Sequence, residues 1–179
     1  TLLVPADHIE AAKFVPLMAD WDGPVTIRIN RSGTPVVHSP TEALEIGKGI
    51  QRRPGSNLTI IACGSMVGRS MAAAEKLSAI GIQARVVEIH TLKPIDEEII
   101  VKAAAETGAI ITAEEHSIIG GLGSAVAEIL ADQRPTTVKR IGIRDTFART
   151  AQDPESLMDA FGLSIENIVM AAKTLMEQR

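Results

Sequence analysis

Apolar residues follow two alternating patterns along most of the chain. From Leu58 onward, short runs that are apolar at nearly every position alternate with longer stretches in which apolar residues recur every three or four positions. The first pattern is typical of buried strands and the second of helices that cover them. Together they predict strands over 58–63, 84–89, 109–114 and 137–142. They predict helices over 66–81, 95–108 and 164–178, and a further helix that begins at a glycine cluster and ends at residue 131.

Strands that are apolar on both faces belong in a parallel sheet with helices on each side. The rear of the chain is therefore predicted to be a doubly wound α/β domain. Gly81 and Gly108 are expected to end the first two helices, and Ser164 is expected to cap the last one.

The front of the chain does not continue this alternation. Asp7 is a candidate helix cap with Glu10 in the third helical position, and Pro16 is expected to interrupt that helix unless it begins a second one. A strand is predicted over 24–29. One helix and one strand cannot form a core, so residues 1–30 are interpreted as the end of a domain that begins outside this sequence. The proline- and glycine-rich stretch that follows is interpreted as a linker, with a short hairpin near 45–52.

Composition narrows the class of partner. The net charge of -4 and the lack of a basic block argue against nucleic acid and anionic membranes. The single Cys63 excludes a disulfide within the chain and favours a cytoplasmic setting, and no apolar run is long enough for a membrane helix. The chain begins at Thr1, not at methionine, so it is expected to be a piece of a longer protein.

The glycine cluster fits a dinucleotide-binding fingerprint only in part. Gly121 and Gly123 have the required spacing, but Val126 stands where the third small residue belongs, and acids precede the cluster. Close packing of a helix on the sheet, or on a partner subunit, is the favoured interpretation. Glu114, Glu115 and His116 at the end of the preceding strand could serve acid–base chemistry, but a structural role is favoured.

Other chemistry is only weakly indicated. The four histidines are scattered without the spacing of zinc ligands, and Ser65 is interpreted as a helix cap because no hydrolase motif surrounds it. Arg31 directly follows the strand 24–29, where its planar guanidinium could bind a phosphate at the sheet edge; an ion pair with a linker acid is the alternative. Arg28 is interpreted as structural, and Asp7 as a cap in preference to a ligand for substrate hydroxyls.

Five segments resemble thiamine-diphosphate-dependent transketolases, in the order in which they occur in the C-terminal half of that family. They are "VPADHIEAAK", "GPVTIRINR", "IHTLKPIDEEII", "EEHSIIGGLGSAVAEIL" and "IGIRDTFARTAQDPESLMDAFGLSIENIV". The resemblance covers nearly the whole chain and includes transketolases split into two subunits. The "LKPID" motif is shared with deoxyxylulose-phosphate synthases and with β subunits of 2-oxoacid dehydrogenases.

The resemblance implies a domain plan and a fold. Residues 1–38 would be the incomplete C-terminal end of the pyrimidine-binding domain, 39–56 a linker, and 57–179 the transketolase C-terminal domain. That last domain is implied to be a three-layer αβα unit with a mostly parallel five-stranded sheet and one antiparallel edge strand.

The resemblance also assigns expected roles to residues. Arg31 is similar to the family's arginine that grips the sugar phosphate, although "NRSG" replaces the family's "SRQ", so its partner stays open. Asp7 resembles a helix-start position. No catalytic residue is assigned to this chain. A packing or subunit interface is expected at Glu114, Glu115, His116, Gly120, Gly121 and Gly123.

The implied function is that of the C-terminal part or subunit of a transketolase, which transfers a two-carbon ketol unit from a ketose phosphate to an aldose phosphate. Thiamine diphosphate and magnesium would be bound by the complete enzyme, because their motifs are not found in this segment, and the segment alone is expected to be inactive. The implied partners are sugar phosphates and an N-terminal half or subunit, in a homodimer or heterotetramer. The alternatives are a 1-deoxy-D-xylulose-5-phosphate synthase, a 2-oxoacid dehydrogenase β-type segment, and a non-catalytic dimerisation or regulatory module.

Overall fold

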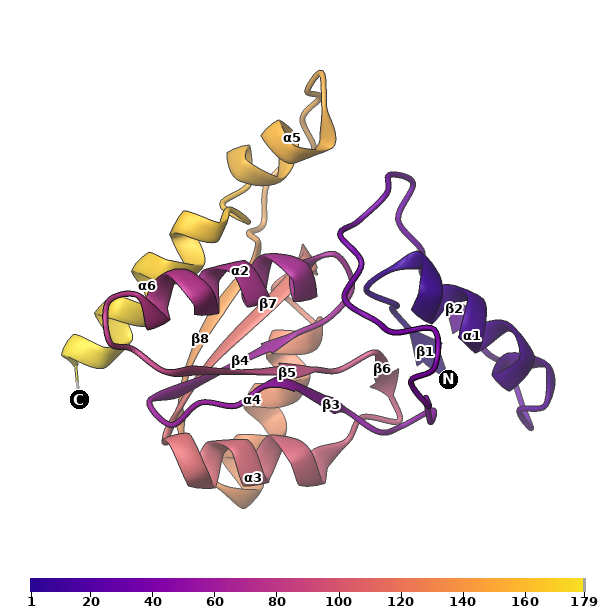
Figure 1. The fold of residues 1–179 in the computed structure, drawn as a ribbon, viewed down its shortest axis with the longest axis horizontal. Coiled ribbons are helices and arrows are strands. Elements are labelled where there is room, and N and C mark those ends of the chain that lie inside the picture. Colours follow the sequence, from indigo (N-terminus) through magenta and orange to yellow (C-terminus); the bar gives the residue numbers. More distant parts are fainter. Residues whose placement is uncertain (179) are drawn as a thin grey trace.

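The computed structural model describes residues 1–178, which form two β-sheets and the helices that cover them (Figure 1). The larger sheet has the strand order β3-β5-β4-β7-β8. Its edge strand β3 is antiparallel to β5, and the other pairs are parallel. This confirms the predicted mostly parallel, five-stranded sheet. Its strands are β3 (Ile50–Arg53), β4 (Leu58–Ala62), β5 (Ala84–Glu88), β7 (Ala109–Ser117) and β8 (Thr137–Ile143).

Helices cover both faces of this sheet and complete a three-layer αβα arrangement. Helices α2 (Met66–Ser78) and α6 (Ile165–Glu177) lie on one face, and α3 (Glu97–Thr107) and α4 (Leu122–Gln133) lie on the other (Figure 1). All five residues of the central strand β4 are buried, because side chains pointing to either face meet a helical layer. The apolar pattern from residue 58 onward was thus a reliable guide to the layers.

The predicted helix-end signals act as expected in this part of the chain. Gly108 adopts a left-handed conformation with φ of 67° at the end of α3. The Ser164 hydroxyl accepts a hydrogen bond of 3.1 Å from the Asn167 amide at the start of α6.

The front of the chain is joined to the rear by a second, small sheet with the order β2-β1-β6. Strands β1 (Leu2–Leu3) and β2 (Thr26–Ile27) come from the front, and β6 (Thr91–Lys93) comes from the rear domain. Helix α1 (His8–Ala19) packs beside them, with Phe14 buried against His90 at a ring-centroid distance of 5.1 Å. The front segment is therefore folded onto the rear domain.

Three local predictions differ from the structure. Helix α1 continues through Pro16, because the Ala12 carbonyl that loses its hydrogen bond lies at an exposed residue. Residues 50–53, within the stretch interpreted as a linker, pair with β5 instead of forming a hairpin. Helix α5 (Pro154–Ala160), which projects from the body in Figure 1, was not predicted.

Within residues 1–178, no helix has the length and apolar content to span a membrane.

Candidate functional site

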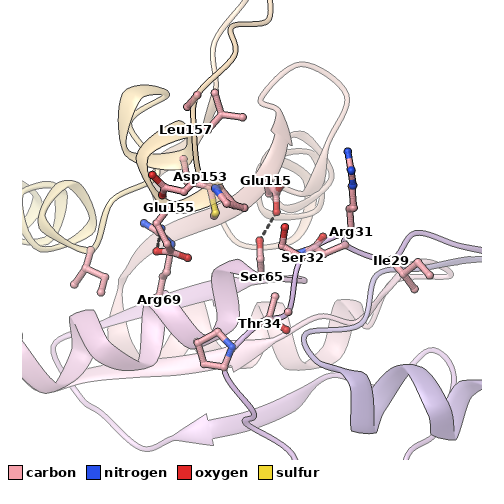
Figure 2. A pocket seen from close by; sticks show the side chains of 18 of the residues that line it. Ile29, Arg31, Ser32, Thr34, Ser65, Arg69, Glu115, Asp153, Glu155 and Leu157 are labelled. Carbon is pink, nitrogen blue, oxygen red and sulfur yellow. Dashed lines mark hydrogen bonds and ion pairs between the residues drawn. The ribbon is translucent and has the colours of Figure 1, made fainter.

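A cavity of about 1000 Å³ lies where the front segment faces the rear domain (Figure 2). One wall is the chain segment 28–35, which follows β2. The other walls are the first turns of α2, Glu115 near the end of β7, and the residues that lead into α5. Because four separate parts of the fold converge here, this is the best candidate for a ligand site in the described chain.

Arg31 lies on the wall of this cavity, four residues beyond the end of β2; its role in substrate binding stays a prediction. It also lines a smaller adjoining cavity of about 260 Å³ beside the start of α1. No hydrogen bond or ion pair joins its guanidinium to another of residues 1–178, so the alternative of an ion pair with a linker acid has no support there. In Figure 2 the Arg31 side chain extends away from the Ser65–Glu115 pair. An unpaired guanidinium on a cavity wall is a suitable group for binding an anion.

Arg28 lines the same cavity and also bridges the two parts of the chain. Its Nη2 donates to the carbonyl oxygen of Glu115 at 2.8 Å. This contact supports the structural role expected for Arg28.

Ser65 does not cap α2 with its side chain. Its hydroxyl instead donates to Oε2 of Glu115 at 2.5 Å, and no capping bond to the helix forms. The predicted cap is wrong: Ser65 has helical backbone angles, φ -53° and ψ -23°, in place of the extended ones of an N-cap, and its oxygen accepts no bond from the helix. Glu115 therefore belongs to the cavity wall, with its carbonyl on Arg28 and its carboxylate on Ser65 (Figure 2).

The opposite side of the cavity carries an arginine that is already neutralised. The Arg69 side chain is 9% exposed and contacts Glu155 and Asp159 of α5, and its Nη1 also donates to the Leu163 carbonyl at 3.0 Å. With its charge matched, Arg69 holds α5 in place, whereas Arg31 has no ion pair among residues 1–178.

The acid–glycine block is an internal packing element. Glu114 is buried, and its carboxylate accepts hydrogen bonds from the Leu122 and Gly123 amides at 2.7 and 2.8 Å. Burial raises the pKa of Glu114, and these two bonds oppose the rise. The positive end of α4, where a phosphate would bind, is thus occupied by the protein's own carboxylate.

The remaining members of the predicted interface set divide by exposure. A Cβ on Gly121 would lie 2.0 Å from Oε2 of Glu114, and one on Gly123 would lie 2.7 Å from Oγ1 of Thr112, so both glycines serve packing within the chain. His116 and Gly120 are exposed. A subunit contact at these exposed positions stays a prediction.

A second polar assembly, which the sequence did not reveal, lies buried beside α1. It links Asp7 and Glu10 to His38, Arg52 and Glu88. Asp7 and Glu10 share only the spacing of a helix cap, and no motif connects them to the other three residues. The one available signal is Glu88, a charged residue inside the apolar run "ARVVEI".

Burial and neighbouring charges shift the pKa values of this assembly. Burial alone would lower the pKa of His38, but the carboxylates of Glu10 and Glu88, each 3.4 Å from Nε2, outweigh it and raise the pKa to about 10. Burial raises the pKa of Glu10 to about 7, against the opposing effect of His38. Burial likewise opposes ionisation of Asp7, but backbone amides lower its pKa to about 2.

Glu10, His38 and Glu88 are the three ligand-type groups that could hold a metal ion, since one atom of each lies within 4.8 Å of the others. The Arg52 guanidinium, however, lies against Nε2 of His38 and donates from Nε to Glu88 at 2.5 Å. A cation of the protein therefore already occupies this position. The start of α4 also does not fit a diphosphate cofactor, because Glu114 fills it.

Comparison with known proteins places these features in a family context. A family model for the transketolase C-terminal domain matches residues 47–168. A 6-deoxy-6-sulfo-D-fructose transketolase subunit of Clostridium sp. (strain MSTE9) is 39% identical over 100% of this chain and 55% of its own length. A 1-deoxy-D-xylulose-5-phosphate synthase of Heliobacterium modesticaldum is 38% identical over 97% of this chain and 27% of its own length.

Among solved structures, a split-gene transketolase described as an inactive beta4 tetramer matches with a TM-score of 0.94 and 43% sequence identity. The match covers 98% of this chain and 57% of that chain. The chain thus spans about half the length of the first relative and of this solved structure.

Proposed function

The chain belongs to the transketolase C-terminal domain family, and from this premise we propose that it is the C-terminal part or subunit of a transketolase. The proposed reaction transfers a two-carbon ketol unit from a ketose phosphate to an aldose phosphate. Residues 1–38 are proposed to be the end of the pyrimidine-binding domain. An N-terminal half or subunit would bind thiamine diphosphate, which supplies the carbanion chemistry of the reaction.

The proposed role of this chain is to bind the substrate phosphate through Arg31. The observation that carries it is an unpaired guanidinium on the wall of the cavity between the front and rear parts of the chain. A planar guanidinium can donate two parallel hydrogen bonds to a phosphate, and Arg31 is exposed where it lines the two cavities.

The experiment is the substitution Arg31→Ala in the enzyme reconstituted with its N-terminal half. Loss of a charge-assisted contact is expected to raise KM for a phosphorylated donor about 10- to 100-fold, with little change for an unphosphorylated ketose. The matched control is Arg134→Ala, since Arg134 is exposed at the end of α4 and lies outside the cavity. Equal effects of Arg31→Ala on both substrates would remove the phosphate role.

A second candidate function is that of a deoxyxylulose-phosphate synthase, because relatives with that name match nearly the whole chain. The donor separates the two reactions. The reconstituted enzyme is expected to consume ketose phosphate in the presence of an aldose phosphate; consumption of pyruvate with release of carbon dioxide would instead support the synthase.

A non-catalytic assembly module is the third candidate, favoured by the solved relative described as an inactive beta4 tetramer. If this chain is a subunit of a split enzyme, mixing it with the missing half should give a larger complex and turnover. A stable assembly that gains no turnover would favour the module.

A further inference from the structure

The segment that carries Arg31 is held by contacts on either side and by none within it. Arg28 is fixed to the Glu115 carbonyl at 2.8 Å, and the Thr34 hydroxyl donates to the Ala6 carbonyl at 2.7 Å. Among the described residues, no hydrogen bond holds any of residues 29–33. The position of Arg31 therefore depends on the two anchors that flank it.

Beyond Thr34, a second anchor on the C-terminal side is Asp7. Its Oδ2 accepts from the Val37 amide at 2.7 Å and from the His38 amide at 2.9 Å, and it also lies 3.2 Å from Nδ1 of His38. The other oxygen, Oδ1, caps α1 through the Glu10 amide. One buried carboxylate thus fixes both the start of α1 and the end of the Arg31 segment.

His38 connects this anchor to the rear domain. Its Nε2 lies 3.4 Å from Oε1 of Glu10 and 3.4 Å from Oε2 of Glu88, and its side chain is fully buried. Arg52 bridges further to Glu88 and, with two bonds of 2.8 and 2.9 Å, to Glu42. The charged groups that face His38 are therefore three carboxylates and one guanidinium, with His90 close by in its neutral form because burial lowers its pKa to about 4.

The three carboxylates around His38 favour its protonated form, against the opposing effect of the Arg52 guanidinium that lies against Nε2. Asp7, Glu10 and Glu88 each lose most of their hydration, and one guanidinium cannot neutralise them and Glu42 together. Oε1 of Glu10 and Oε1 of Glu88 have no hydrogen-bond partner, so removing the imidazolium would leave uncompensated buried charge. The structure would then relax by moving the groups held by Asp7, among them Val37 and residue 38 itself.

We propose that His38 is a positioning residue for phosphate binding: placed between Asp7, Glu10 and Glu88, it holds the end of the segment that presents Arg31 to the cavity. The inference rests on the proposed function for the role of Arg31. The ordering of segment 29–37 by His38 is a separate physical claim and can be tested independently.

The test compares His38→Gln with the double substitution His38→Gln/Glu10→Gln in the reconstituted enzyme. His38→Gln is expected to raise KM for a phosphorylated donor about tenfold at pH 8, with kcat and the KM for an unphosphorylated ketose nearly unchanged. Removing the Glu10 charge should restore most of that loss, because the Gln oxygen can still accept from the Ala6 amide. Hydrogen exchange over 29–37 should be faster in the single variant and slower again in the double variant.

Each outcome bears on the proposal. If His38→Gln weakens both donors equally, or speeds exchange throughout the protein without selectivity for 29–37, His38 is only a stabilising core residue and the proposal fails. Recovery of the single variant by added Zn²⁺, in place of recovery by Glu10→Gln, would show a metal site and overturn it as well. If Arg31→Ala shows no preference for phosphorylated donors, the proposed function fails, while exchange over 29–37 still decides the ordering claim.

Discussion

At the scale of single residues, Glu114 explains why the glycine cluster is not a nucleotide site. The carboxylate supplies from within the chain the negative charge that the start of α4 would otherwise take from a phosphate. The glycines are still required, since Gly121 lies directly against that carboxylate. A glycine cluster at the start of a helix therefore occurs in two different arrangements: in one the helix start is open to a ligand, and in the other a side chain of the protein fills it.

Gly121→Ala is expected to destabilise the protein by at least about 2 kcal/mol. The new Cβ would lie 2.0 Å from Oε2 of Glu114 and 2.7 Å from the Ser117 carbonyl; the carboxylate can move only by losing its two bonds, and the carbonyl belongs to the backbone. Gly33→Ala is the control, because its Cβ would meet nothing within 4 Å. Urea unfolding of the two variants measures the difference, and equal midpoints would contradict the packing role.

At the scale of elements, the sequence predicted the strands and helices whose residues are buried in a regular pattern. It did not predict the short strands that form only by pairing with a segment distant in the sequence. Strand β4 is buried on both faces, so every position shows in the pattern. Strand β6 has three residues and exists only because β1 lies beside it, and β3 becomes a strand by pairing with β5. Neither pairing can be read from the short segments themselves.

The candidate site was predicted to a similar extent. Arg31 could be singled out because its position follows a strand directly, which is a local signal. The roles of Ser65 and Glu115 could not be predicted, because a serine before a helix could equally be a helix cap. Only the folded structure places β7 beside α2 and brings the two side chains together. His38 and Arg52 carry no local signal, and Glu88 shows only as a charged residue in an apolar run, since only the fold brings the three together.

Arg69 is expected to control the docking of α5. The Arg69→Ala variant loses the contacts with Glu155 and Asp159 and the bond to the Leu163 carbonyl, so hydrogen exchange in 154–160 should accelerate by more than about tenfold. The loss of global stability should be smaller, about 1 to 2 kcal/mol, because both acids are more than half exposed.

Lys76→Ala is the matched control for Arg69→Ala. Lys76 pairs with Glu166 of α6, but both side chains are more than half exposed, so this variant should leave both exchange and stability nearly unchanged. If the two substitutions behave alike in exchange mass spectrometry, α5 is held by its apolar contacts alone.

At the scale of the whole molecule, the buried assembly of Asp7, Glu10, His38, Arg52 and Glu88 makes the packing of the front segment on the rear domain sensitive to pH. His38 has a pKa of about 10 in the folded protein against an ordinary 6.5, so the folded state binds more protons between these values. Its contribution to stability is complete below pH 6.5 and is lost as pH rises towards 10. At lower pH two other groups have opposite effects on stability. The pKa of Glu10 is raised to about 7, so its contribution to stability falls as pH rises from 4.5 to 7. The pKa of His90 is lowered to about 4, so its contribution to stability increases as pH rises from 4 to 6.5.

Stability is therefore expected to be nearly level between pH 5 and 6.5 and to fall above that range, by about 2 to 3 kcal/mol by pH 9. The measurement should stop at pH 9, because burial raises the pKa of Cys63 from 9 to about 12, so that thiol adds a fall of its own at higher pH. In the His38→Gln/Glu10→Gln variant the decline between pH 6.5 and 9 should nearly vanish, since it lacks both groups whose pKa values are raised into this range, although the variant is less stable at pH 6.5. If stability declines equally in the variant and in the unsubstituted protein, the packing of the front segment on the rear domain does not depend on the imidazolium.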